Sequence, residues 1–368
     1  MSGMEDVRKL DSNFAVGTGT MDGMDVYTVD HESMDLSGFC WREKGGRFRR
    51  FPEDMDLEFN PGVKSLSWCT AGGHVRFRSN AREIRVHAIT SGGRMCHMAQ
   101  VGSRGFDLYV GRNHTEVFAK SARFELDRDE YTSTLFSSPN AEFRDFTIYF
   151  PLYAGVDFLE IGVSSGASVV KAAPWPDPRP VVVYGTSITQ GGCVSRPGML
   201  YSNILSRLIR RPVWNFGFSG SGKGEPQIAR KLAEIEDPAM YILDYDDNAG
   251  PELLKKTLAP FIRILRESHP DTPILALSTE PKSAEAFEPF DSAYASQERP
   301  LYNAVHLETD AAMRAGGDDH IYYLDGRMLY GADFEECTVD GAHATDLGTY
   351  RIAHALKPLV ERILDRWW

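Results

Sequence analysis

The alternation of hydrophobic and polar residues divides the chain into two parts. Between about residues 35 and 165, short segments of alternating polarity are separated by Gly, Asn, Ser and Asp, which is typical of half-buried antiparallel strands. Several such strands at short spacing predict a β-sandwich of the jelly-roll kind. The clearest of these segments are His74–Arg78, Ile84–Ala88, Phe106–Val110, Phe146–Phe150 and Phe158–Ile161.

After residue 180 the pattern changes to short apolar runs, each followed by a segment with helical periodicity. The runs are Val181–Tyr184, Val213–Phe216, Tyr241–Leu243, Ile274–Leu277 and Ile321–Leu324. Apolar residues recur every third or fourth position over residues 200–209 and 253–265, and a last amphipathic helix is expected over residues 347–364. The regular alternation predicts a flavodoxin-like three-layer α/β/α fold with a parallel sheet.

A proline-rich segment separates the two parts. Four prolines lie between Lys171 and Pro180, so this segment can form neither a helix interior nor a central strand. We therefore expect a β-sandwich domain over residues 1–170, a linker over residues 171–180 and an α/β domain over residues 181–368.

Charge and composition exclude several classes of partner. The formal net charge of −12 disfavours general affinity for nucleic acid or anionic lipid. No segment approaches the roughly 18 consecutive apolar residues that a membrane span requires. The N-terminus lacks the apolar stretch of a secretory signal, so we expect a cytoplasmic protein; a homo-oligomer is compatible with the sequence.

Two local features modify this picture. The five cysteines are scattered without the paired spacing of a zinc site, which predicts mostly free thiols. A basic cluster of Arg47, Arg49 and Arg50 is interleaved with phenylalanines, and we interpret it as a solvated surface run.

Candidate chemistry lies at the carboxyl ends of the parallel strands, where strand-to-helix loops gather. Ser187 follows the first of these strands at the expected start of a helix. A serine hydroxyl needs a base to become a nucleophile, and that base needs a carboxylate to hold its tautomer. Asp340 and His343, three residues apart before the last helix, provide such a pair.

Two further loops at the same sheet edge offer hydrogen-bond donors for an oxyanion. The loop after the second strand holds Gly217, whose backbone N–H is one candidate donor. The loop after the third strand holds Asn248, whose side-chain amide is another. Together with the Ser187 N–H, these groups predict an oxyanion hole.

Four groups of residues follow successive strands in this order: Gly185-Thr186-Ser187, Gly217, Asn248 and Asp340-x-x-His343. In these residues and their order the chain resembles the SGNH or GDSL hydrolase superfamily. The segments Ser79–Val86 and Gly105–Tyr109 resemble the β-sandwich that precedes the catalytic domain in one branch of this family. The resemblance implies that Ser187 is the nucleophile, that Asp340 and His343 complete its triad, and that Ser187, Gly217 and Asn248 form the oxyanion hole. It also implies a reaction without metal or organic cofactor.

The chain departs from the family pattern at a few positions. The usual Gly-Asp-Ser is Gly-Thr-Ser here, and Ala344 replaces the proline that often follows the histidine. Asp246 and Asp247 make the third loop more acidic than is usual in this branch. None of these changes removes a catalytic group.

The expected function is a serine carboxylic ester hydrolase that acts through an acyl-enzyme. The resemblance points to a carbohydrate esterase or deacetylase acting on short acyl esters, with a small-molecule or saccharide ester as substrate. An acyltransferase that uses the same triad with an acceptor other than water is the alternative.

Two other readings have less support. The run from Gly217 to Lys223 matches the first seven positions of a phosphate-binding P-loop, but the eighth is Gly224, which lacks the hydroxyl that binds Mg²⁺. A non-catalytic carbohydrate-binding protein is the other reading. Trp41, Trp68 and Trp175 could stack on sugar rings, although buried core aromatics are the simpler interpretation.

Overall fold

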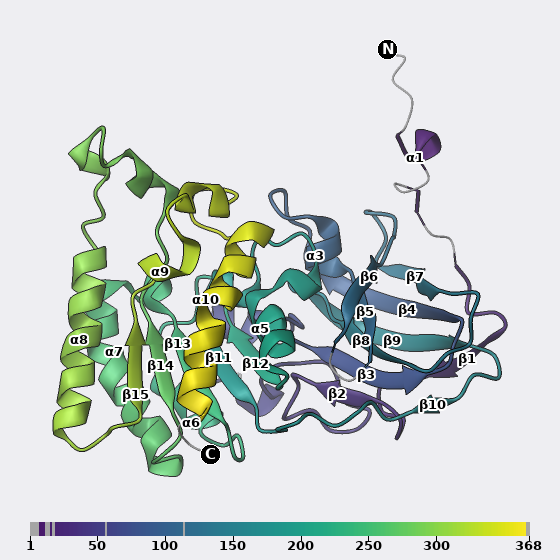
Figure 1. The fold of residues 1–368 in the computed structure, drawn as a ribbon, viewed down its shortest axis with the longest axis horizontal. Helices are drawn as coiled ribbons and strands as arrows, with labels where there is room; N and C mark the ends of the chain where they lie inside the picture. Colours follow the sequence, from purple (N-terminus) through teal and green to yellow (C-terminus); the bar gives the residue numbers. More distant parts are fainter. Residues whose placement is uncertain (1–6, 12–14, 17–18, 56, 113–114, 366–368) are drawn as a thin grey trace.

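The computed structural model describes the whole chain except residues 1–6, 12–14, 17–18, 56, 113–114 and 366–368. The N-terminal half is a sandwich of two antiparallel sheets, and the C-terminal half is a parallel sheet covered by helices (Figure 1). Both parts of the predicted fold are confirmed.

The sandwich follows the predicted alternation of polarity. One sheet has the strand order β1-β9-β4-β7: β1 Met24–Tyr27, β9 Ala154–Ser164, β4 Glu83–Gly92 and β7 Glu130–Ser137. The other has the order β10-β3-β8-β5-β6, with β2 paired to β3: β10 Val169–Val170, β3 His74–Ser79, β8 Arg144–Tyr149, β5 Asp107–Gly111, β6 Val117–Ser121 and β2 Asp35–Ser37. In β4, Ile84, Val86 and Ala88 are buried and pack between the sheets, whereas the residues between them are more exposed.

Short helices complete this half of the chain. They are α1 Val7–Leu10, the 3₁₀ turn Glu53–Met55, α2 Pro61–Leu66 and α3 Gln100–Arg104. Asn60 caps α2 by accepting the Val63 N–H at 2.9 Å.

The parallel sheet has the strand order β12-β11-β13-β14-β15: β12 Val213–Gly217, β11 Val181–Gly185, β13 Met240–Asp244, β14 Ile274–Leu277 and β15 Ile321–Leu324. Its helices are α4 Ser187–Gln190, α5 Tyr201–Ile209, α6 Pro226–Leu232, α7 Asp246–Ser268, α8 Arg299–Ala315, α9 Arg327–Tyr330 and α10 Asp346–Leu364. The 3₁₀ turns are Pro197–Met199, Ser283–Phe287, Ser292–Tyr294 and Phe334–Cys337. None of the described helices has the length and apolar character to cross a membrane.

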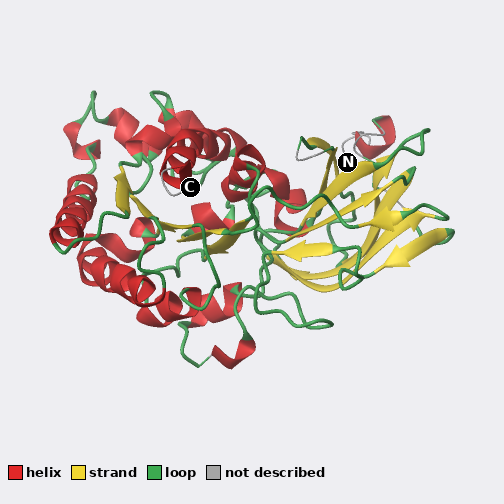
Figure 2. Ribbon diagram, turned by 60° about the horizontal axis from the view of Figure 1, so that its bottom comes forward, coloured by secondary structure: helices red, strands yellow, loops and turns green. Residues whose placement is uncertain are grey.

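Helices cover both faces of this sheet, as Figure 2 shows. Val182 and Tyr184 of β11 pack into the core under α6, α7 and α8, whereas Val181 and Val183 pack into the core under α5 and α10. Side chains of a strand alternate between faces, so a strand covered on both sides must be apolar throughout. This explains the short, wholly apolar runs in the sequence.

One segment of the N-terminal half packs on the α/β half instead of the sandwich. Phe51 and Phe59 lie in the same core as Phe216 and Phe218 of β12 and the loop that follows it, with Phe51 and Phe216 stacked at 5.1 Å between ring centroids. This segment covers the edge of the sheet at β12. The solvated-run interpretation of the neighbouring basic cluster is wrong, because Arg50 is completely buried.

A second contact between the halves uses the Gly105–Tyr109 segment that carried the family resemblance. The Asp107 carboxylate accepts hydrogen bonds at 2.8 Å from the Arg196 guanidinium and from the Gly198 N–H. Burial raises the Asp107 pKa to about 6, although Arg196 opposes this shift. The Asp107 carboxylate thus joins the sandwich to the loop before α5.

Candidate active site

Ser187 lies on a sharp turn between strand β11, which is the neighbour of the edge strand β12, and the short helix α4. Thr186 is the N-cap of α4, and its hydroxyl accepts the Ile188 N–H at 3.2 Å. The side chain of Ser187 is partly exposed at the carboxyl edge of the sheet. Within the described part of the chain, the Ser187 N–H has no hydrogen-bond partner, which leaves it available to a ligand.

A buried polar cluster at the end of β13 holds helix α4 in place. The Thr189 hydroxyl donates to Asp244 at 2.7 Å, and the Tyr201 hydroxyl donates to the same oxygen at 2.9 Å. Burial raises the Asp244 pKa to about 7; the two hydroxyls oppose this shift, and the charges of Asp246 and Asp247 add to it. The cluster fixes the position of α4, and with it that of Ser187.

Asp340 and His343 form the predicted pair. The His343 Nδ1 lies 2.7 Å from Asp340 Oδ2, and the His343 N–H donates to Asp340 Oδ1 at 2.8 Å. Burial opposes ionisation of Asp340, but these bonds and one from the Ala342 N–H outweigh it and hold the Asp340 pKa below its usual value. The carboxylate therefore orients the ring and leaves Nε2 free of this pairing.

The turn after α4 connects the serine to the histidine. The N–H groups of Gly191 and Gly192 both donate to the Ser187 carbonyl at 2.9 Å, and the Cys193 N–H donates to the Ala344 carbonyl at 2.9 Å. Among the described residues, no hydrogen bond joins Ser187 Oγ directly to His343. Catalytic hydrogen bonds are often long without substrate and shorten in the complex.

The structure contradicts the assignment of the Gly217 N–H to the oxyanion hole, because that N–H donates to Asn215 Oδ1 at 3.0 Å. Gly217 has a different role. A Cβ at this position would lie 2.2 Å from the Gln190 backbone nitrogen, so glycine is what allows α4 to pack closely on β12.

The same loop offers another donor at Gly220. Its N–H has no partner among the described residues, and its φ of +65° belongs to the left-handed region. Gly220 follows Ser219, whose hydroxyl lies 2.8 Å from the Tyr153 hydroxyl. The Tyr153 hydroxyl in turn donates to the Ser187 carbonyl at 3.4 Å. The Gly220 N–H is therefore close to the serine turn and free to bind a ligand.

Asn248 lies in the first turn of α7, before the backbone leaves helical geometry at Gly250. Its side-chain amide donates to the Phe218 carbonyl at 3.1 Å, which ties the third loop to the second. An amide group has two N–H bonds, so the second remains available.

The acidic residues beside Asn248 have structural partners. The Asp246 carboxylate is buried 2.9 Å from His306 Nε2 of α8, and Asp247 lies 3.1 Å from Lys282 Nζ. Burial raises the Asp246 pKa, while the contact with His306 opposes the shift. Asp246 thus fixes the third loop to α8.

Two residues of the N-terminal half reach this site without any signal in the hydrophobic pattern. Tyr153, directly before β9, makes the contacts with Ser187 and Ser219 described above. Arg50 donates to the Gly217 carbonyl at 2.6 Å and lies over the Phe218 ring at 4.4 Å. The arginine-phenylalanine run around Arg50 was the one available clue.

The P-loop interpretation is wrong, because several backbone N–H groups of this loop already have hydrogen-bond partners within the protein. The Ser221 and Gly222 N–H groups both donate to the Phe218 carbonyl, and the Gly224 N–H donates to the Tyr184 hydroxyl at 2.9 Å. A phosphate-binding loop needs these groups to converge on the anion. Here they stabilise the loop itself.

Comparisons with known proteins agree with this geometry. Residues 178–361 match the GDSL-like lipase/acylhydrolase family, and residues 24–169 match the N-terminal domain of SGNH-hydrolase-type esterases. A comparison with curated proteins returned no match.

Solved structures share the fold over most of the chain. A GDSL-like lipase from Bacteroides ovatus is 30% identical, with a TM-score of 0.83 over 93% of this chain and 98% of that chain. A salicylyl-acyltransferase from a tetracycline biosynthetic pathway is 18% identical, with a TM-score of 0.73 over 92% and 96%. A family two carbohydrate esterase from Cellvibrio japonicus is 13% identical, with a TM-score of 0.56 over 94% and 99%. The chain therefore belongs to the GDSL-like lipase/acylhydrolase family of carboxylic ester hydrolases.

Proposed function

We propose that the protein is a serine esterase that removes short acyl groups, acetyl foremost, from carbohydrate alcohols through an acyl-enzyme. The observation that carries the proposal is the 2.7 Å pairing of His343 with Asp340, on a loop hydrogen-bonded to the turn that follows Ser187. A base held by a carboxylate near a partly exposed serine is the arrangement that nucleophilic acyl transfer requires.

In the proposed reaction, His343 Nε2 takes the Ser187 hydroxyl proton as Oγ attacks the ester carbonyl. The N–H groups of Ser187 and Gly220 and the free amide N–H of Asn248 stabilise the tetrahedral oxyanion, where each donor is worth about 2.7–4 kcal/mol. The tetrahedral intermediate then expels the alcohol, which leaves with the proton held by His343. Water, deprotonated by His343, releases the carboxylic acid and restores the serine.

The carbohydrate assignment is supported by fold likeness. Besides the esterase from Cellvibrio japonicus, an acetyl xylan esterase from Butyrivibrio proteoclasticus matches with a TM-score of 0.57 over 94% of this chain. Both proteins have names that describe esterases of carbohydrates.

An acyltransferase is the second candidate. The salicylyl-acyltransferase fold matches with a TM-score of 0.73, above the 0.56 of the carbohydrate esterase from Cellvibrio japonicus. The two reactions share the acyl-enzyme and differ in the acceptor that attacks it. Adding alcohol acceptors to a hydrolysis assay separates them, because a transferase forms new ester faster than it forms free acid.

Hydrolysis of p-nitrophenyl acetate by the purified protein and by Ser187→Ala tests the serine mechanism. The variant should lose activity by about 10⁴-fold or more, because no other hydroxyl can replace the nucleophile. Ser165→Ala, which removes an exposed serine hydroxyl of the sandwich, is the matched control and should keep full activity.

Circular dichroism establishes that the Ser187→Ala variant is folded. Equal rates in the Ser187→Ala variant and the unmodified protein would remove Ser187 from the mechanism. If the serine is essential, a panel of acetylated mono- and oligosaccharides then tests the substrate class. Cleavage of aryl acetates without any acetylated sugar would reject the carbohydrate assignment.

A further inference from the structure

A histidine, a cysteine and the proposed catalytic histidine meet at the boundary between the two halves. One potential ligand atom from each of His97, Cys193 and His343 lies within 4.8 Å of the other two. The rings of His97 and His343 have centroids 6.0 Å apart, and His97 Nε2 lies 4.0 Å from Asp340 Oδ2. These side chains come from three loops that are distant in the sequence.

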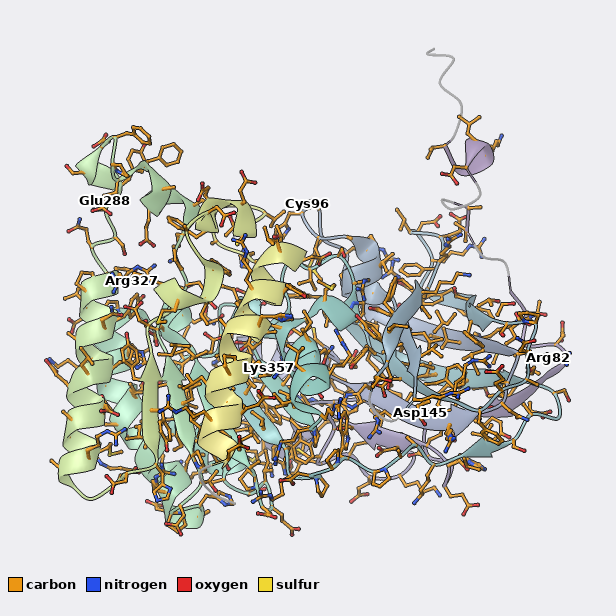
Figure 3. All side chains as sticks on the ribbon, viewed as in Figure 1. Arg82, Cys96, Asp145, Glu288, Arg327 and Lys357 are labelled. Atoms are coloured by element: carbon orange, nitrogen blue, oxygen red, sulfur yellow. The ribbon has the colours of Figure 1, made fainter. Side chains whose placement is uncertain are left out.

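A hydrogen bond joins two of these three loops, and the third loop reaches them from the sandwich. His97 lies on the loop between β4 and α3, and Figure 3 shows its neighbour Cys96 at the top of this loop, near the start of α10. The hydrogen bond from the Cys193 N–H to the Ala344 carbonyl joins the turn after α4 to the loop that carries His343. The sandwich thus brings His97 to the edge of the catalytic loops.

The donor set has the chemistry of a zinc site. Imidazole nitrogen and thiolate sulfur are ligands that Zn²⁺ and Co²⁺ prefer and that Mg²⁺ avoids. His343 already pairs its Nδ1 with the Asp340 carboxylate, which is the outer-sphere arrangement that orients a histidine toward zinc. The side chains of His97 and His343 are 39% and 33% exposed, so a cation can reach them from solvent.

The Cys193 thiol makes no hydrogen bond among the described residues, and its side chain lies in a small buried apolar cluster. Zinc-type cations bind the thiolate form of cysteine, so binding at Cys193 displaces the thiol proton.

We propose that His97, Cys193 and His343 form an inhibitory binding site for a divalent cation of the zinc type. The inhibitory part rests on the proposed function. Because His343 Nδ1 is paired with Asp340, a metal binds the Nε2 lone pair, and this is the lone pair that would accept the Ser187 proton. Binding forms one bond to sulfur and two to imidazole nitrogens, and it releases the thiol proton to solvent. Water completes the four-coordinate shell.

The site needs a small contraction to bind the metal. Bonds of 2.0–2.3 Å in a tetrahedral zinc site place the ligand atoms about 3.3–3.8 Å apart, so atoms within 4.8 Å must approach one another by at most about 1.0–1.5 Å. Rotation of the exposed His97 side chain can supply this movement. The site therefore joins the sandwich to the catalytic loops through the metal.

Cobalt binding tests the site without relying on activity. Titration of the full-length Ser187→Ala protein with Co²⁺ should produce a thiolate-to-cobalt charge-transfer band in the near ultraviolet, which excess Zn²⁺ removes. The band should be absent in the double variant that adds Cys193→Ser. No thiolate band, or an unchanged band in the double variant, would overturn the site. Since Ser187 is already replaced, this result is independent of the proposed reaction.

Inhibition of p-nitrophenyl acetate hydrolysis by Zn²⁺ tests the regulatory consequence. Outer-sphere partners alone are worth about 10- to 100-fold in metal affinity, so His97→Gln and Cys193→Ser should each raise the half-inhibitory zinc concentration by at least about tenfold. Cys96→Ser, which removes the adjacent thiol, is the matched control and should be inhibited like the unmodified protein. Mg²⁺ should not inhibit.

Equal zinc sensitivity in His97→Gln, Cys193→Ser and the unmodified protein would overturn the inhibitory site. Loss of zinc sensitivity in Cys96→Ser would overturn the assignment of Cys193 as the thiol ligand. If Ser187→Ala keeps esterase activity but the cobalt band is present, the proposed function fails and the metal site stands. If Ser187→Ala loses esterase activity and the cobalt band is absent, the proposed function stands and the metal site is rejected.

Discussion

The Asp340 carboxylate binds both the side chain and the backbone of His343. One carboxylate oxygen lies 2.7 Å from His343 Nδ1, and the other accepts a hydrogen bond from the His343 backbone N–H at 2.8 Å. Replacing Asp340 with Asn removes the negative charge that selects the productive tautomer, so kcat for ester hydrolysis should fall on the order of 10⁴-fold. Steady-state kinetics with p-nitrophenyl acetate measure this change.

The matched control for Asp340→Asn is Asp333→Asn, which changes an exposed carboxylate that pairs with Arg351 on α10. This variant should retain nearly full activity, because Asp333 does not contact the proposed triad. An Asp340→Asn variant with unchanged kcat would show that His343 does not depend on this carboxylate.

At the scale of the element, α4 depends on the buried carboxyl group of Asp244. Its pKa is raised from 3.8 to about 7, so between these values the folded protein holds a proton that the unfolded chain has released. This contribution to the free energy of unfolding is fully present at low pH and is lost as the pH rises through that window. Each pKa unit corresponds to about 1.4 kcal/mol, so the loss is at most a few kcal/mol.

The variant Asp244→Asn should therefore show a smaller decrease in unfolding free energy between about pH 4 and pH 7 than the unmodified protein. Urea unfolding at both pH values measures this difference. Asp177→Asn is the matched control. Burial opposes ionisation of Asp177, but hydrogen bonds from Arg179 and the charge of Arg211 hold its pKa below 3.8, so its contribution to the free energy of unfolding is lost only as the pH falls below about 4. The change between pH 4 and pH 7 should therefore be the same in Asp177→Asn as in the unmodified protein. Identical pH dependence in Asp244→Asn and the unmodified protein would contradict the raised pKa.

At the scale of the whole molecule, Arg50 connects the two halves. It is completely buried, and its guanidinium donates to the Leu66, Cys69 and Gly217 carbonyls at 2.6–2.8 Å. Burial lowers the Arg50 pKa to about 10, and within the described residues no carboxylate pairs with it. The positive charge is satisfied by backbone carbonyls from both sides of the boundary.

Replacing Arg50 with Met should lower the free energy of unfolding by about 3 kcal/mol or more, because several buried carbonyls lose their donor. Esterase activity should fall as well, since Arg50 holds the Gly217 carbonyl and the Phe218 ring beside the serine turn. The neighbouring Arg47 is exposed over Trp68, and Arg47→Met should change stability by less than about 0.5 kcal/mol. Thermal or urea unfolding compares the two variants, and equal losses would contradict this role for Arg50.

The hydrophobic pattern by itself determined the secondary structure and the layers of each half. A period of two identifies strands with one buried face, and short runs without polar residues identify strands covered on both faces. The order of strands then placed Ser187, Asn248, Asp340 and His343 at loops on one edge of the sheet. The assignments of Ser187, Asp340, His343 and Asn248 to catalysis stay predictions until the variants are measured.

Only the tertiary structure decided how the two halves combine. The Gly217 N–H donates to the side chain of Asn215. The buried Arg50 and the exposed His97, both from the N-terminal half, contact the catalytic loops. Local periodicity reports which face of a segment is buried, but it carries no information about which distant segment covers that face. Backbone hydrogen bonding in loops and contacts across the domain boundary depend on that packing, so they had to be read from the fold.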